Sequence, residues 1–70
     1  MSNPTAAFVR HRRKALNLTQ PELAAKAGVG LRFVRELEAG KATLQLAKVN
    51  QVLALFGHEL VPAPQTRPAD

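Results

Sequence analysis

Apolar residues recur every three or four positions along most of this chain, which is the spacing of one face of an α-helix. Four such runs, separated by capping and stop residues, predict helices at about residues 4–16, 20–27, 31–39 and 44–56. The residues expected to face inward are Val9, Arg13, Leu16, Leu23, Ala24, Ala27, Val34, Leu37, Leu46, Val49, Val52, Leu53 and Phe56. The pattern therefore predicts an all-α fold of four or five helices.

Local signals define where these helices begin and end. Thr19 and Glu22 have the spacing of a capping box, in which the hydroxyl accepts from the Glu22 amide and the carboxylate accepts from the Thr19 amide. Gly28 suits a left-handed stop between the second and third helices. Thr43 is expected to cap the last helix, and Gly57 to end it.

Residues 58–61 are too few for another helix and are predicted to form a strand that ends at Pro62. One strand has no partner within the chain, so its backbone groups favour pairing with the same strand of a second copy. The expected organisation is a flexible N-terminus at 1–4, a helical domain at 5–57, a dimerisation strand at 58–62 and a mobile tail at 63–70.

Composition narrows the class of protein. The chain has 70 residues, which is one small domain, and no cysteine, so neither a disulfide nor a thiolate zinc site can stabilise it. A core of this size supplies roughly 3–5 kcal/mol, which favours self-association. No apolar run approaches the roughly 18 residues of a membrane span, so we expect a cytoplasmic protein without membrane contact.

The charge balance points to a polyanion as partner. The chain contains ten Lys and Arg residues and five Asp and Glu residues, which gives a formal net charge of +5. Arg10, Arg12 and Lys14 form one basic cluster, which we assign to electrostatic steering only. Arg32, Arg35 and Lys41 belong to a second cluster, and these three are candidates for direct contact.

Two short helices, a tight glycine-containing link and a basic second helix are typical of a helix-turn-helix, which lays its second helix in the major groove of DNA. The pattern is Leu-Thr-Gln-x-x-Leu-Ala from Leu18, then Gly28-Val29, then Val-x-x-Leu-Glu-x-Gly-Lys ending at Lys41. It resembles the phage-repressor-like (XRE) helix-turn-helix family, from about residue 8 to residue 57. The resemblance implies a DNA-binding fold.

The resemblance also implies an ion pair between Arg13 in the first helix and Glu38 at the end of the third. Such a pair would explain a charged residue in the inward face of the first helix. The alternative is that both side chains are solvated, with Arg13 a surface cation. If the pair forms, Arg13 has a structural role rather than a base-reading one.

Three groups of residues are expected to contact DNA. The start of the second helix offers amides and a side-chain amide to a phosphate, the exposed side of the third helix meets base edges, and the start of the fourth helix meets phosphate. The residues are Thr19, Gln20, Gly30, Leu31, Arg32, Arg35, Lys41 and Thr43. Arg32 suits guanine and Arg35 a phosphate. For Phe33 three contacts stay open: a thymine methyl, a partner protein or the fourth helix.

The fourth helix with its Leu-Phe-Gly end and following strand is similar to HipB-type antitoxins. That resemblance implies a homodimeric repressor that autoregulates a toxin–antitoxin operon and binds a HipA-type kinase toxin. The expected dimer interface is Phe56, His58, Glu59, Leu60 and Val61. Pairing there would set two recognition helices roughly 34 Å apart on a palindromic operator in double-stranded DNA.

Two other classes stay open at this point. One is a stand-alone phage-type or restriction-modification regulator, and the other is a protein-interaction adaptor that uses the same motif. Catalysis is not expected, because the hydroxyl residues lack a neighbouring base. No cofactor or metal is expected either, since His11 and His58 lack further ligands at metal spacing apart from Glu59.

Overall fold

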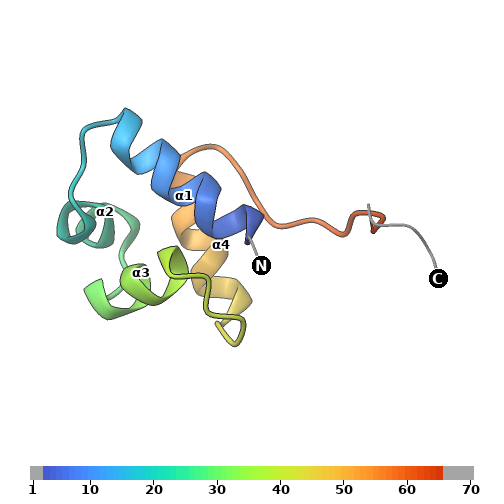
Figure 1. Ribbon diagram of the computed structural model, residues 1–70. Coiled ribbons are helices and arrows are strands. Elements are labelled where there is room, and N and C mark those ends of the chain that lie inside the picture. The colour runs from blue at the N-terminus through green and yellow to red at the C-terminus, as the bar shows by residue number, and fades with distance from the viewer. Residues whose placement is uncertain (1–2, 66–70) are drawn as a thin grey trace.

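The computed structural model describes residues 3–65, which fold into four helices (Figure 1). They are α1 (Pro4–Ala15), α2 (Gln20–Ala27), α3 (Leu31–Glu38) and α4 (Leu46–Leu55). α3 packs against both α1 and α2, and α2 also packs against α4. The all-α prediction with four helices is confirmed for the described part of the chain.

Side-chain caps fix the starts of α1 and α2. The Asn3 side chain accepts from the amides of Thr5 and Ala6 at 3.0 and 3.1 Å. The capping box at α2 is present as predicted: Thr19 Oγ1 accepts from the Glu22 amide at 3.2 Å, and Glu22 Oε1 accepts from the Thr19 amide at 2.8 Å. Each bond satisfies a first-turn amide that has no partner within its helix.

The link between α2 and α3 is short because Gly28 reverses the chain. Its φ of 75° lies in the left-handed region, as the sequence predicted, and its amide and that of Val29 both donate to the Ala24 carbonyl at 3.0 Å. Ala24 itself is buried. The tight turn brings α2 and α3 into contact in the helix-turn-helix arrangement.

The core lies where the four helices meet. Val9, Leu23, Val34 and Val52 are fully buried, one from each helix in turn. The other buried members of this cluster are Ala24, Leu37, Val49, Leu53 and Phe56. Most inward-facing residues predicted from the periodicity are therefore confirmed.

Two predicted core positions are wrong, and both lie at helix ends. Leu46 is 69% exposed and Leu16 is 52% exposed. α1 stops at Ala15, so Leu16 no longer follows the helical spacing, and Asn17 turns away with a φ of 57°. Leu46 is the first residue of α4, and the half-buried Leu44 of the preceding loop packs against the core instead.

Thr43 is not the cap of α4, which corrects another prediction. The helix begins at Leu46, its N-cap is Gln45, and that cap makes no side-chain hydrogen bond. Residues 41–45 form an irregular loop in which Thr43 is exposed. Threonine is a good N-cap, which favours Thr43, but α4 starts only after Leu44, whose side chain packs against the core.

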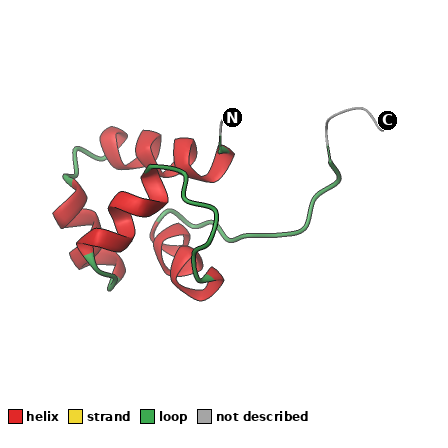
Figure 2. Cartoon of the chain, turned by 60° about the horizontal axis from the view of Figure 1, so that its bottom comes forward, coloured by secondary structure: helices red, strands yellow, loops and turns green. Residues whose placement is uncertain are grey.

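The predicted strand at residues 58–61 is absent from the described chain, where this segment is loop (Figure 2). It follows α4 back along the domain: the His58 amide donates to the Leu53 carbonyl at 2.9 Å, and the Leu60 amide donates to Asn50 Oδ1 at 2.8 Å. A strand requires a neighbouring ladder, and a single chain offers none. Of the predicted flexible start at 1–4 and mobile tail at 63–70, residues 1–2 and 66–70 lie outside the described residues. Asn3 and Pro4 are not part of a flexible start, because Asn3 caps α1 and Pro4 is its first residue, and residues 63–65 are loop.

Candidate nucleic-acid interface

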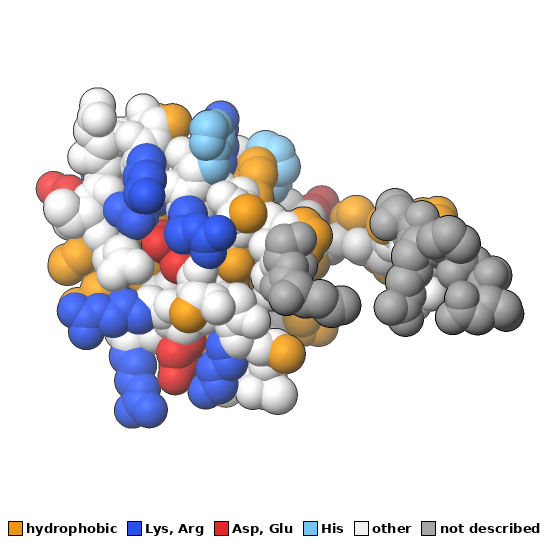
Figure 3. All heavy atoms as spheres, in the orientation of Figure 1, with side chains coloured by type: hydrophobic (Ala, Val, Ile, Leu, Met, Phe, Trp, Pro, Cys, Tyr) orange, Lys and Arg blue, Asp and Glu red, His pale blue; other side chains and the backbone are white. Residues whose placement is uncertain are grey.

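Basic side chains gather over α1 and α3 on one face of the molecule (Figure 3). On α3, Arg32 and Arg35 are exposed, and the Arg32 side chain retains 91% of its accessible surface. Leu31 is only half-buried and packs against the core with its inner part. The outer side of α3 therefore presents two exposed guanidinium groups beside the half-buried Leu31.

Glu36 lies among these cations and pairs with two of them. Its Oε2 is 3.5 Å from Arg32 Nε and 3.2 Å from Lys41 Nζ. The pKa of Glu36 is lowered, first by the hydrogen bond from Lys41. The arrangement links Lys41, just beyond α3, to a guanidinium on the helix itself. These are solvent-exposed pairs of small strength that a phosphate can replace.

Gly30 and Thr43, the other residues near α3 that are predicted to contact DNA, form no ion pair like those of Glu36 in the described structure. Gly30 is the exposed N-cap of α3 and makes no side-chain cap. A side chain added there would meet nothing within 4 Å, so the backbone is open to close approach. Thr43 lies exposed in the loop before α4.

The structure brings Arg13 and Glu38 together in a bidentate ion pair. Arg13 Nε donates to Glu38 Oε2 at 2.7 Å, and Nη2 donates to Oε1 at 3.0 Å. Burial alone would raise the pKa of Glu38, but hydrogen bonds from Arg13 and Gln20 outweigh it and hold the pKa below its usual value. Glu38 is 4% exposed, so the pair is part of the packed interior.

Gln20 and Arg10 also form hydrogen bonds to Glu38, and neither bond was predicted from the sequence. Gln20 Nε2 donates to Glu38 Oε1 at 3.0 Å, and an Arg10 Nη1 donates to the Glu38 backbone carbonyl. Arg10 therefore also holds α1 to the end of α3, in addition to the electrostatic steering expected of its cluster. Its position one turn before Arg13 on the same side of α1 was the available signal.

The start of α2 is less open than predicted. The Thr19 amide is taken by Glu22, so it is not free for a phosphate. Within residues 3–65, the backbone amide of Gln20 has no hydrogen-bond partner. Gln20 is therefore the residue through which this helix end can meet a phosphate.

The predicted dimer residues divide into two kinds. His58, Glu59 and Val61 are exposed and Leu60 is half-buried, whereas Phe56 is 7% exposed and belongs to the core of its own chain. Its ring packs edge-on against Phe8 with centroids 6.2 Å apart. Phe56 is thus not available to a second copy, which corrects that part of the prediction.

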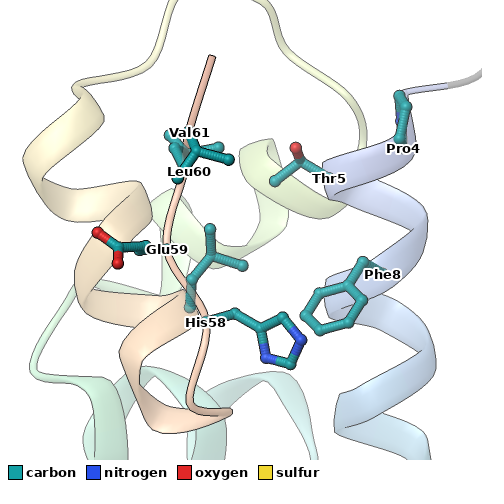
Figure 4. A pocket seen from close by; sticks show the side chains of 8 residues that line it. Pro4, Thr5, Phe8, His58, Glu59, Leu60 and Val61 are labelled. Carbon is teal, nitrogen blue, oxygen red and sulfur yellow. The ribbon is translucent and has the colours of Figure 1, made fainter. Parts of the chain in front are cut away.

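An open groove of about 350 Å³ runs between the start of α1 and the segment after α4 (Figure 4). It is lined by Pro4, Thr5, Phe8, Leu53, His58, Glu59, Leu60 and Val61. The His58 ring lies 4.6 Å from the Phe8 ring, centre to centre, and its Nδ1 is 2.7 Å from the Phe56 carbonyl oxygen. Phe33, whose role was open, packs partly against the core.

The fold and the basic face define a DNA-binding helix-turn-helix protein. The helix-turn-helix family pattern HTH_3 matches residues 9–60, most of the chain, and the chain belongs to this family of XRE-type transcriptional regulators, which are not enzymes. It is similar to the HTH-type transcriptional regulator y4mF of Sinorhizobium fredii, with 61% identity over 51 residues. The match covers 73% of this chain and 67% of that protein.

Neither a membrane span nor a metal site is found in the part of the chain that the structure describes. None of its helices is long and apolar enough to cross a bilayer. No group of three or more His, Cys, Asp or Glu side chains is placed to hold a metal ion there.

Proposed function

We propose that this DNA-binding regulator is a sequence-specific repressor that binds a palindromic operator as a homodimer. The observation that carries the proposal is the outer side of α3, where Arg32 and Arg35 are exposed beside the cations of α1. Arg32 reads a guanine, and Arg35 and Lys41 contact phosphates. Leu31 meets a thymine methyl, and the open backbone at Gly30 permits close approach to the duplex.

The test of DNA binding is a titration of the full chain against a pool of random duplexes, followed by a salt series on the selected sequence. Each cation on a phosphate releases counterions and adds about 0.9 to the slope of log affinity against log salt. Arg35→Gln should lower that slope, whereas Arg32→Gln should change the selected sequence. The lack of any salt-dependent binding to duplex DNA would reject the proposal and favour a protein-interaction adaptor.

The dimer is proposed to form along residues 58–61, and their backbone supports it. Successive amides of an extended chain point to opposite edges. The His58 and Leu60 amides donate to α4, at the Leu53 carbonyl and Asn50 Oδ1. In an extended chain the amides of Glu59 and Val61 would then turn outward. Pro62 and Pro64 follow Leu60 at every second position, so they fall on the inward edge of the extended chain. Proline has no amide hydrogen, but an amide on that edge would not take part in pairing with a second copy. The outer edge is therefore the one that can pair.

This edge is complementary to itself. With a twofold axis beside Leu60, Glu59 lies opposite Val61 of the partner subunit, and each pair exchanges two backbone hydrogen bonds. No carboxylate faces a carboxylate in this register, and the exposed Val61 side chains gain apolar contacts. Twofold pairing also gives the symmetry that a palindromic operator requires.

Val61→Pro and Val61→Ala separate backbone pairing from side-chain packing. Proline removes the outward amide but fits an extended backbone, whereas alanine keeps the amide. We expect Val61→Pro to be monomeric and Val61→Ala to stay dimeric in sedimentation experiments. A dimeric Val61→Pro would reject this edge as the interface, and salt-dependent binding of that variant to a half-site would still report on α3.

We further propose that the repressor is the antitoxin of a HipBA-like operon, autoregulates its promoter and binds a kinase toxin. The support is the resemblance of the sequence of the fourth helix and its Leu-Phe-Gly end to HipB-type antitoxins. The test is to co-express the chain with the product of the neighbouring reading frame and to assay that product for kinase activity. A stoichiometric complex with a kinase is expected. A neighbour that neither binds nor phosphorylates would favour a stand-alone regulator.

A further inference from the structure

Glu38 makes more contacts than its ion pair requires. Arg13 alone gives each carboxylate oxygen a hydrogen bond, and Oε1 accepts a further one from Gln20 Nε2 at 3.0 Å. Gln20 is 18 residues away in sequence, at the first position of α2, and is only half-buried. The additional bond thus connects a buried carboxylate to a half-buried side chain at the start of α2.

The bond fixes the orientation of the Gln20 amide. A carboxylate only accepts hydrogen bonds, so the NH₂ group must face Glu38 and the amide oxygen must face away. Turning the amide by half a revolution would place two acceptors against each other. One of the two N–H bonds serves Glu38, which leaves the second free to donate elsewhere.

Few other donors are free in the first turn of α2. Pro21 has no amide hydrogen, the Thr19 and Glu22 amides are used by the capping box, and the Leu23 amide donates to the Thr19 carbonyl at 3.0 Å. Within residues 3–65, the Gln20 backbone amide has no partner. A phosphate at this helix end would therefore meet the two free N–H groups of Gln20, which carry no charge.

We propose that Glu38 is a positioning residue that holds Gln20 as a neutral phosphate donor. Because Glu38 is the last residue of α3, the same carboxylate keeps this phosphate contact in register with the base contacts of α3. Arg13 completes the link, since its Nη1 donates to the Leu18 carbonyl at 2.9 Å in the loop before α2. The inference rests on the DNA-binding surface proposed above.

The experiment measures affinity for the selected operator and for an unrelated duplex over a salt series, with the full chain. Gln20→Met and Gln20→Asn should each weaken binding to both duplexes about tenfold, the loss of one hydrogen bond to a charged group. The salt slope should not change, because no cation is lost. Lys41→Met is the charged control and should lower the slope by about 0.9.

Glu38→Gln tests whether Glu38 acts through Gln20. Its single acceptor oxygen would be taken by Arg13, whereas the backbone carbonyl that Arg10 uses remains. Binding should fall about tenfold in the wild-type background. In the Gln20→Met background the same change should alter affinity by less than about twofold, since coupled residues are not additive.

Three outcomes would overturn the proposal. They are wild-type affinity in Gln20→Asn, a changed salt slope in either Gln20 variant, or full additivity of the Gln20 and Glu38 changes. Thermal melting of every variant separates lost binding from lost folding, and both Gln20 variants retain the ion pair if Glu38→Gln unfolds. If the wild-type protein does not bind DNA, the proposed function itself is wrong.

Discussion

Glu38 is the buried charged residue of the described chain, and its protonation determines how the fold responds to acid. Burial pushes its pKa up, but hydrogen bonds from Arg13 and Gln20 bring it below the usual 4.5. The unfolded chain therefore takes up this proton at a higher pH than the folded chain, so acid favours unfolding. The pKa values of Glu22 and Glu36 are lowered as well, by the Thr19 backbone and by Lys41.

We expect the free energy of unfolding to be constant above about pH 5.5 and to fall as the pH drops below 4.5. Urea titrations at a series of pH values measure this. Glu38→Gln cannot take up the proton, so its stability should be lower at pH 7 but should change less between pH 5 and pH 3. Equal pH dependence in the variant and the wild type would contradict a role for Glu38.

Glu36 is the acidic residue closest to the proposed base-reading side chains, and its removal should tighten DNA binding. Its carboxylate holds Arg32 and Lys41 and would repel a phosphate. Glu36→Gln should raise the affinity for any duplex several-fold at low salt, with a smaller gain at high salt. Arg12→Gln, on the first basic cluster, is the opposite control and should lower the on-rate only. Weaker binding by Glu36→Gln would mean that the carboxylate orients Arg32 productively.

At the scale of elements, the geometry of the helix-turn-helix depends on Gly28. A Cβ at this position would meet only Gln51 Nε2 at 3.7 Å, so the obstacle to a side chain is the left-handed φ of 75° and not a clash. Gly28→Ala should lower the free energy of unfolding by about 1–2 kcal/mol. Gly28→Asn is the matched control and should cost less, because asparagine tolerates this conformation. Equal losses in urea titrations would point to packing as the cause.

How well the elements could be predicted depended on whether their signals are local. The capping box at Thr19 and the stop at Gly28 lie within a few residues of the boundaries they set, and both were read from the sequence. The start of α4 was not, because Leu44 and Leu46 are both apolar and only tertiary packing selects Leu44 for the core. Helix propensity cannot make that choice.

In the candidate DNA-binding site, too, local signals could be predicted from the sequence and contacts between distant residues could not. The exposed cations of α3 follow from helical spacing, and the meeting of Arg13 with Glu38 from a family resemblance. The bond from Gln20 to Glu38 joins residues 18 apart in sequence and leaves no local pattern. The segment 58–61 was predicted to be a strand from its composition, but an extended chain becomes a strand only beside another, which one copy cannot provide.

At the scale of the whole molecule, the small core and the proposed dimer are connected. Among residues 3–65 the buried apolar cluster has nine members, of which only Phe56 is aromatic, and Val61 stays 68% exposed. A domain of this size gains stability from association, and the gain depends on protein concentration. The proposed pairing of residues 58–61 would therefore serve folding and operator recognition together.

The dimer predicts a strict dependence on operator spacing. Two recognition helices held by one rigid pairing must enter the major groove on the same side of the duplex, about one turn of roughly 34 Å apart. Inserting 5 base pairs between half-sites turns one of them to the opposite side, and inserting 10 restores the side but adds a full turn of distance. Both insertions should reduce the affinity to that of a single half-site.

Val61→Pro supplies the control for this experiment. As a monomer it should bind each half-site independently, so its affinity should be the same for the native spacing and for both insertions. Wild-type protein that tolerates the 10-base-pair insertion would mean that the two domains are joined flexibly, and that residues 58–61 do not hold them in a fixed twofold arrangement. Wild-type protein that tolerates the 5-base-pair insertion as well would mean that one domain alone reads the operator.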